Sequence, residues 1–121
     1  MPIKTVLIID DSPTERHILS QLLLGGGYEV SSAESGDEGI ARAKQIKPDL
    51  ILMDVVMPGT NGFQATRALA RDEATKHIPV IICTTKVQET DKVWGLRQGA
   101  RDYVTKPVDG PVLLAKIAAL G

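Results

Sequence analysis

The sequence has a single cysteine, Cys83, and few aromatic residues: one Trp, two Tyr and one Phe in 121 residues. One cysteine cannot form an intramolecular disulfide, which fits a reducing compartment, so we expect a cytoplasmic protein. With so few aromatics, the core must consist of Val, Ile, Leu, Ala and Met. The length of the chain fits one domain of ordinary size.

Long runs of one charge or of apolar residues are also absent. Fourteen Lys and Arg against fifteen Asp and Glu give a net charge of -1. Because no basic run could follow a phosphate backbone, we expect no nucleic-acid partner. No apolar stretch approaches the roughly 20 residues of a membrane span, and the N-terminal run is too short for a signal peptide. We therefore expect no membrane partner.

Short apolar runs alternate with segments of helical periodicity along the chain. The expected strands are residues 6–9, 28–32, 50–53, 79–83 and 103–105, and the expected helices begin near Pro13, Ser35, Phe63, Glu89 and Val112. Parallel strands need helical crossovers, so this alternation predicts a doubly wound α/β domain with helices on both faces of a parallel sheet.

The first two helices carry local signals in the sequence. Ser12 followed by Glu15 predicts a capping box, in which each side chain bonds the backbone of the other residue. The helical spacing also predicts that Ile18 and Ile46 belong to the core-facing stripes of these helices.

Polar side chains follow four of the five expected strands. Asp10 and Asp11 follow the first strand, Asp54 follows the third, Thr84 the fourth and Lys106 the fifth. Taken singly, each also fits a solvated turn, a helix cap or a surface charge. Because ligands of doubly wound folds bind beyond the carboxyl ends of the strands, we expect these five residues to meet at one edge of the sheet.

Three carboxylates brought together repel one another unless a cation joins them. Mg²⁺ (or Mn²⁺) prefers such oxygen ligands and leaves positions open for a phosphoryl oxygen. With the Lys106 ammonium beside the metal, Asp54 could act as the nucleophile of a phosphoryl transfer. The Thr84 hydroxyl could then donate a hydrogen bond to the transferred group.

These positions resemble the receiver domain of two-component response regulators over the whole chain. The resemblance rests on Asp10-Asp11, on the D-x-x-M-P-x-x-x-G motif of residues 54–62, on Thr84, and on Lys106-Pro107. It implies a flavodoxin-like (βα)5 fold with strand order 2-1-3-4-5, and a single receiver domain over residues 1–121 with no output domain. Residues 61–67 and 94–108 are similar to the PilH type, the stand-alone regulators of chemosensory systems that control type IV pili and twitching motility.

The resemblance also implies a role for each site residue. Asp54 is the expected phosphoryl acceptor, and Asp11 and Asp54 would bind the metal directly together with the main-chain carbonyl of Val56. Asp10 would contribute mostly through water, and Lys106 would pair with the phosphate or with the acceptor carboxylate.

A switch and an output face are implied in the same way. Thr84 would turn inward on phosphorylation and allow the ring of Tyr103 to follow. The expected output face consists of Glu89, Lys92, Leu96, Tyr103, Thr105, Val112 and Lys116. Trp94 lies beside it and fits either core packing or a partner anchor.

The expected partners are a histidine kinase of the CheA-like type and an unidentified downstream protein, with the chain a monomer or a weak phosphorylation-dependent dimer.

An alternative function is that of a magnesium-dependent phosphatase of the haloacid-dehalogenase type, which also uses an aspartate nucleophile. Such enzymes place a second acid two residues after the nucleophile, where this chain has Val56. A transcription factor is disfavoured because no residues remain after the last helix for a DNA-binding domain.

Overall fold

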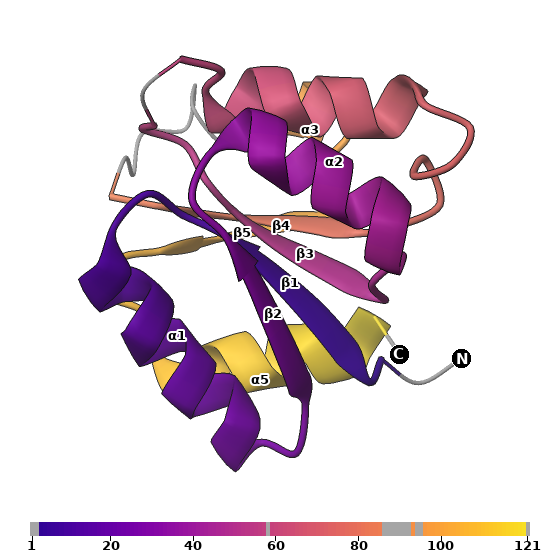
Figure 1. Ribbon diagram of the computed structural model, residues 1–121. Helices are drawn as coiled ribbons and strands as arrows, with labels where there is room; N and C mark the ends of the chain where they lie inside the picture. The colour runs from indigo at the N-terminus through magenta and orange to yellow at the C-terminus, as the bar shows by residue number, and fades with distance from the viewer. Residues whose placement is uncertain (1–2, 58, 86–92, 94–95, 121) are drawn as a thin grey trace.

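The computed structural model describes residues 3–57, 59–85, 93 and 96–120. A five-stranded parallel sheet in the order β2-β1-β3-β4-β5 forms its centre, which confirms the predicted doubly wound fold (Figure 1). The strands are β1 Thr5–Ile9, β2 Glu29–Ala33, β3 Leu50–Asp54, β4 Val80–Thr84 and β5 Asp102–Thr105, and the helices are α1 Pro13–Gly25, α2 Gly36–Ile46, α3 Gly62–Arg71 and α5 Gly110–Leu120. Most of the helix predicted near Glu89 lies outside the described residues. Within the described ranges, no helix is both long and apolar enough to cross a bilayer.

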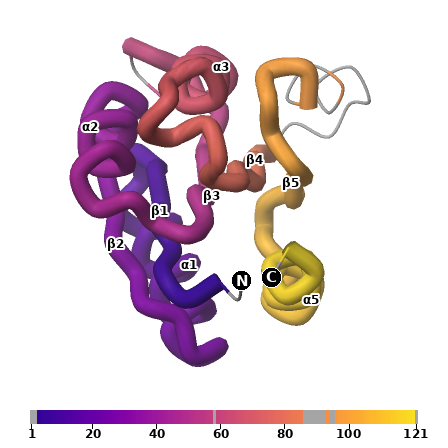
Figure 2. The backbone as a smooth tube through the Cα atoms, turned by 90° about the vertical axis from the view of Figure 1, so that its right-hand side faces the viewer, coloured from indigo at the N-terminus to yellow at the C-terminus, as the bar shows by residue number. Residues whose placement is uncertain are grey.

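Helices cover both faces of the sheet. Figures 1 and 2 show α2 and α3 on one face and α1 and α5 on the other. Side chains of β1 alternate between the two sides, so Val6 and Ile8 pack with α1 and α5 while Leu7 and Ile9 pack with α2 and α3. The core is therefore split into two apolar layers with the sheet between them.

The helix starts depend on side-chain caps. At α1 the Ser12 hydroxyl accepts a hydrogen bond from the Glu15 amide at 3.3 Å, but the return bond of the predicted capping box is not among the described bonds of this helix. A complete capping box forms at α3, where Asn61 and Gln64 bond each other's backbone. This box at α3 was not predicted, although Asn61 and Gln64 have the required spacing.

The apolar stripes predicted for α1 and α2 include residues that the structure leaves exposed. Leu19 and Leu23 are buried, but Ile18 is 46% exposed and Ile46 is 39% exposed, so both predictions were wrong. Ile18 lies one residue, about 100° around the helix, from the buried row of α1. Ile46 is the last residue of α2, just before Lys47 leaves the helix with φ of 47°.

Candidate active site

The carboxyl ends of the strands bring the predicted site residues to one edge of the sheet. Asp10 directly follows β1, Asp54 is the last residue of β3, Thr84 is the last of β4, and Lys106 directly follows β5. Asp10, Asp54 and Thr84 are 1%, 8% and 4% exposed. These are polar side chains in a largely dry setting, so each needs a partner.

Lys106 joins two of the carboxylates. Its Nζ donates a hydrogen bond to Oδ2 of Asp10 at 2.8 Å and another to Oδ1 of Asp54 at 3.1 Å. All three side chains are at most 10% exposed, so water screens these ion pairs only weakly. The contact with Asp54 agrees with the role expected from the family resemblance, whereas the shorter contact with Asp10 had not been predicted.

Asp10 is held from several sides. Its Oδ1 accepts a hydrogen bond from the Ser12 amide at 2.9 Å, and its main-chain oxygen accepts one from Nη1 of Arg16 at 2.7 Å. Both carboxylate oxygens of Asp10 are thus hydrogen-bonded, one to Ser12 and one to Lys106. The structure therefore gives Asp10 a direct role in fixing Lys106, while its expected role toward a metal through water stays a prediction.

The charges of the site do not balance. Burial raises the pKa of Asp54 above its ordinary value and the negative charge of Asp10 adds to the effect, although Lys106 opposes both. Burial alone would lower the pKa of Lys106, but its contacts with Asp10 and Asp54 outweigh this and leave that pKa raised. Lys106 therefore stays charged at neutral pH, and one ammonium faces more than one carboxylate.

The donor set fits a hard divalent cation. Asp10, Asp11 and Asp54 each present a carboxylate oxygen, and these oxygens lie within 4.8 Å of one another. Asp11 is exposed, so the cluster is open to solvent on one side. Mg²⁺ takes oxygen ligands and keeps several waters, which suits an open cluster of carboxylates. The role of the Val56 carbonyl stays a prediction, and the Val56 residue itself is 61% exposed.

Gly62 lets α3 begin beside Asp54. Its amide donates a hydrogen bond to the Val55 carbonyl at 2.9 Å. A Cβ at this position would meet the main-chain oxygen of Asp54 and the Cα of Val55. The start of α3 can therefore lie this close to Asp54 and Val55 only because residue 62 has no side chain.

The expected switch residues lie on neighbouring strands next to this site. The Thr84 carbonyl accepts a hydrogen bond from the Lys106 amide at 2.9 Å. Tyr103 lies opposite Ile82 in the register of β4 and β5 and packs against a small cluster of apolar residues. Nζ of Lys116 lies 5.8 Å from the centroid of the Tyr103 ring. Main-chain hydrogen bonding and strand pairing thus link the Thr84 and Tyr103 positions to the Lys106 loop.

Part of the expected output face gathers around one groove of about 370 Å³. The lining residues are Tyr103, Val104, Thr105, Pro107, Asp109, Val112 and Lys116. They include the expected Tyr103, Thr105, Val112 and Lys116, and Val112 is 47% exposed. Leu96, also 47% exposed, does not line the groove, and Glu89, Lys92 and Trp94 lie outside the described residues.

Two further residues, Cys83 and Asp49, are structural and lie outside the site. Cys83 is 1% exposed within β4, and burial raises the pKa of its thiol to about 12, so it is an inert core side chain. Asp49 was missed: its Oδ2 accepts hydrogen bonds from the amides of Lys4 and Thr5 at 2.9 and 3.1 Å and ties β3 to the start of β1.

Comparison with known proteins agrees with this geometry. Residues 6–118 match the response regulator receiver domain family. Protein PilH of Pseudomonas aeruginosa is 62% identical over 115 residues, which cover 95% of each chain. The phosphate regulon transcriptional regulatory protein PhoB of the same organism is 43% identical, and the match covers 97% of this chain but 51% of that protein.

A solved structure extends the agreement to three dimensions. The chemotaxis protein CheY4 of Vibrio cholerae superposes with a TM-score of 0.91 at 32% identity, covering 98% of this chain and 99% of that one. The family match, the sequence identity and the fold all indicate the same protein family. The chain belongs to the response regulator receiver domain family and is a homologue of the PilH protein.

Proposed function

We propose that the protein is a phosphorylation-dependent signalling switch of a two-component system, with Asp54 as the phosphoryl acceptor. The main support is the pair of buried salt bridges that Lys106 forms with Asp10 and Asp54 at the carboxyl edge of the sheet. A nucleophilic carboxylate with a raised pKa, an ammonium 3.1 Å away and an open acidic cluster form a set suited to receiving a phosphoryl group.

The donor in this proposal is a phosphohistidine on a CheA-like histidine kinase. An Asp54 oxygen attacks the phosphorus, a new P–O bond forms, and the P–N bond to the kinase histidine breaks with its electron pair returning to the imidazole. Lys106 is close enough to exchange its contact with Asp54 for one with an oxygen of the transferred group. Its second contact, with Asp10, holds the ammonium in place throughout.

Asp10, Asp11 and Asp54 would hold Mg²⁺ together with the Val56 carbonyl. The bound metal supplies positive charge opposite the phosphoryl oxygens, which lowers the barrier to transfer. The hydroxyl of Thr84, buried at the end of β4, would donate a hydrogen bond to a phosphoryl oxygen. Without the metal, the chain's own ammonium faces the carboxylate cluster and an incoming phosphoryl group would be repelled.

The output of the switch is the groove between β5 and α5. Tyr103 lies on β5 two residues before Thr105, and its ring lies under the Lys116 ammonium. A shift of Thr84 toward the phosphoryl group would make room for the Tyr103 ring to move inward and reshape the groove at Val112 and Lys116. A downstream protein would then read the reshaped surface.

The cellular role we propose is control of type IV pilus twitching motility, in the cytoplasm. The support is the 62% identity to Protein PilH over nearly the full length of both chains, together with the similarity of residues 61–67 and 94–108 to regulators of pilus systems. The chain would act as a monomer or a weak phosphorylation-dependent dimer.

Labelling with acetyl phosphate tests the acceptor. Intact-protein mass spectrometry in the presence of Mg²⁺ should show one added phosphoryl group, which chelation of the metal and the Asp54→Asn variant should each abolish. Asp37→Asn, on α2 outside the cluster, serves as the matched control and should be labelled like the parent protein. Labelling of the Asp54→Asn variant at full level would exclude Asp54 as the acceptor.

The phosphatase alternative lacks a structural observation in its favour. The position two residues after Asp54 is the exposed, apolar Val56, which cannot act as a general acid. Steady turnover of small phosphoesters by the protein would be needed to support that function.

A further inference from the structure

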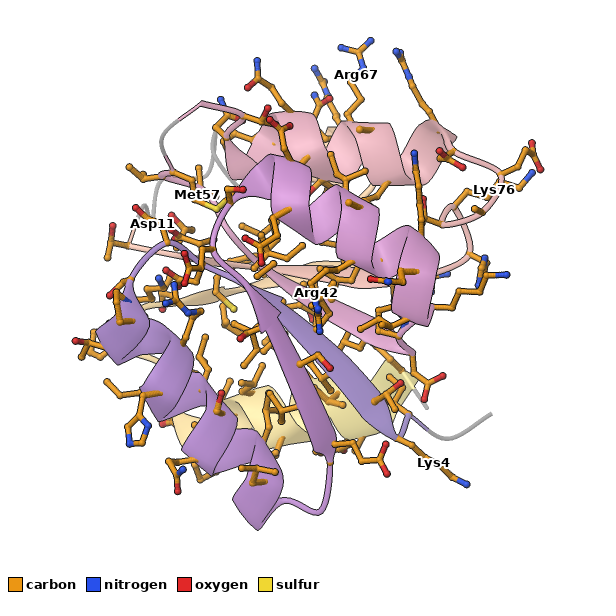
Figure 3. All side chains as sticks on the ribbon, in the orientation of Figure 1. Lys4, Asp11, Arg42, Met57, Arg67 and Lys76 are labelled. Carbon is orange, nitrogen blue, oxygen red and sulfur yellow. The ribbon has the colours of Figure 1, made fainter. Side chains whose placement is uncertain are left out.

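Three arginines meet on the α3 side of the molecule. Arg67 and Arg71 lie four residues apart on α3, and Arg97 comes from the segment that precedes β5. Together with Ala70, Gln98 and Gly99 they line a groove of about 360 Å³, called here the arginine groove. Figure 3 shows Arg67 extending outward from α3, on the opposite side of the molecule from α5. The groove is therefore a different surface from the one between β5 and α5.

Gly99 brings the two segments together. It has φ of +111°, a conformation that other L residues rarely adopt, and a Cβ there would lie 2.8 Å from Cβ of Ala70. Its amide also donates a hydrogen bond to the Leu96 carbonyl at 3.1 Å, which closes the turn after Arg97. The close approach at Ala70 places Arg97 beside the two arginines of α3.

The positive charge of the groove is not neutralised within the described chain. Some other cations of the described surface have acidic partners, such as Lys44 with Asp72 at 2.9 Å and Lys76 with Glu73 at 2.8 Å. None of the ion pairs among the described residues includes an arginine of the groove, and α3 has no acidic residue along its length.

The spacing of the arginines makes this lack of neutralisation costly. Arg67 and Arg71 are neighbours at i and i+4 on α3, and like charges at this spacing destabilise a helix. An acidic partner bound at this groove would offset the repulsion between Arg67 and Arg71. Relief of this repulsion would therefore add to the binding free energy.

We propose that the arginine groove binds an acidic segment of a partner protein that carries at least two carboxylates a few residues apart. The planar guanidinium forks match carboxylates in a bidentate manner, and all three arginines are exposed, which suits surface docking. A nucleic-acid site would need a longer basic stripe, whereas the neighbours here are the neutral Ala70, Gln98 and Gly99 in a chain of net charge -1. This contact goes beyond the proposed phosphoryl switch and does not depend on the state of Asp54.

Binding of a fluorescein-labelled octaglutamate peptide to the full chain, followed by anisotropy at low salt, tests the proposal. The parent protein should bind, and the R67Q/R71Q/R97Q variant should bind about tenfold more weakly, as expected for the loss of three exposed ion pairs. The matched control K4Q/K47Q/R101Q removes three positive charges from exposed residues elsewhere and should stay within about twofold of the parent. Asp54→Asn should bind like the parent.

Two outcomes would overturn the proposal: no binding of the peptide to the parent protein, or equal weakening in the control and groove variants. A single-stranded DNA oligonucleotide of eight nucleotides is the competing probe, and tighter binding of DNA than of peptide through the same arginines would also overturn it. Thermal unfolding checks the variants, and the single variants R67Q and R97Q repeat the test if the triple variant is less stable than the parent.

Discussion

The Nζ of Lys106 lies 2.8 Å from Oδ2 of Asp10, closer than the 3.1 Å that separates it from Oδ1 of Asp54. The Asp10 side chain is 2% exposed, and its other oxygen accepts a hydrogen bond from Ser12. Lys106 is therefore anchored on a residue other than the proposed phosphoryl acceptor.

Replacing Lys106 by Met should destabilise the metal-free protein by about 3 kcal/mol, because the variant leaves two buried carboxylates without their ammonium. Mg²⁺ should restore part of the loss, since it can balance the same charges. Urea unfolding with chelator and with Mg²⁺ measures both effects. Lys76→Met, which breaks an exposed ion pair with Glu73, should cost less than about 1 kcal/mol. Equal losses in the two variants would contradict the anchoring role of Lys106.

Asp54→Asn should make the metal-free protein more stable at pH 7. Burial and Asp10 raise the pKa of Asp54, so the folded state binds this proton more tightly than the unfolded state. The stability conferred by the protonated carboxyl is lost as pH rises above the ordinary value of 3.8 and through the raised folded value. Unfolding titrations at several pH values should show a gain at pH 7 that disappears near pH 3. Saturating Mg²⁺ should reverse the order, and a stability gain independent of pH would exclude this explanation.

Gly62→Ala should destabilise the protein by about 3 kcal/mol or more, because the new methyl group would clash with the backbone of Asp54 and Val55. It should also slow labelling by acetyl phosphate, since the acceptor strand must shift. The comparison is Gly25→Ala at the end of α1, where an added Cβ meets nothing within 4 Å. That variant should be neutral or slightly more stable in the same unfolding assay. Similar stability of the two variants would be incompatible with the tight turn.

Asp49→Asn should cost about 1 kcal/mol at pH 7, because the carboxylate accepts two backbone hydrogen bonds at the start of β1. The amides of Lys4 and Thr5 lower the pKa of Asp49, so its contribution is present above the ordinary value of 3.8 and is lost as pH falls through the lowered folded value. The stability difference from the parent should therefore shrink below about pH 4. Glu29→Gln, at an exposed carboxyl on β2, should leave stability nearly unchanged.

The sequence predicted the fold because its apolar runs are short, regular and separated by clear stop signals. The periodicity of apolar residues predicted which helix positions favour the core. The width of the buried stripe, however, depends on how each helix packs on the sheet. Ile18 shows this, since it belongs to the apolar pattern of α1 and yet lies beside the contact row of Leu19 and Leu23.

The site was predicted to the level of residues but not of contacts. Asp10, Asp54 and Lys106 could be brought together because each lies at the carboxyl end of a parallel strand, and all such ends meet at one edge of the sheet. The pairing of Lys106 with Asp10 depends on the path of the loop after β5, which no spacing reveals. Asp49 escaped notice because its partners lie more than forty residues away, and Arg97 because only the turn at Gly99 brings it to α3.

The bridge from Lys106 to Asp10 joins residues 96 positions apart, and β3 and β4 lie between their strands in the sheet. A chain still being synthesised would contain Asp10, Asp11 and Asp54 long before the ribosome reached Lys106. Until then the acidic residues would repel one another with no ammonium between them. The proposed phosphoryl site would therefore be complete only after β5 has joined the sheet, so a copy that has not reached this stage should not accept a phosphoryl group.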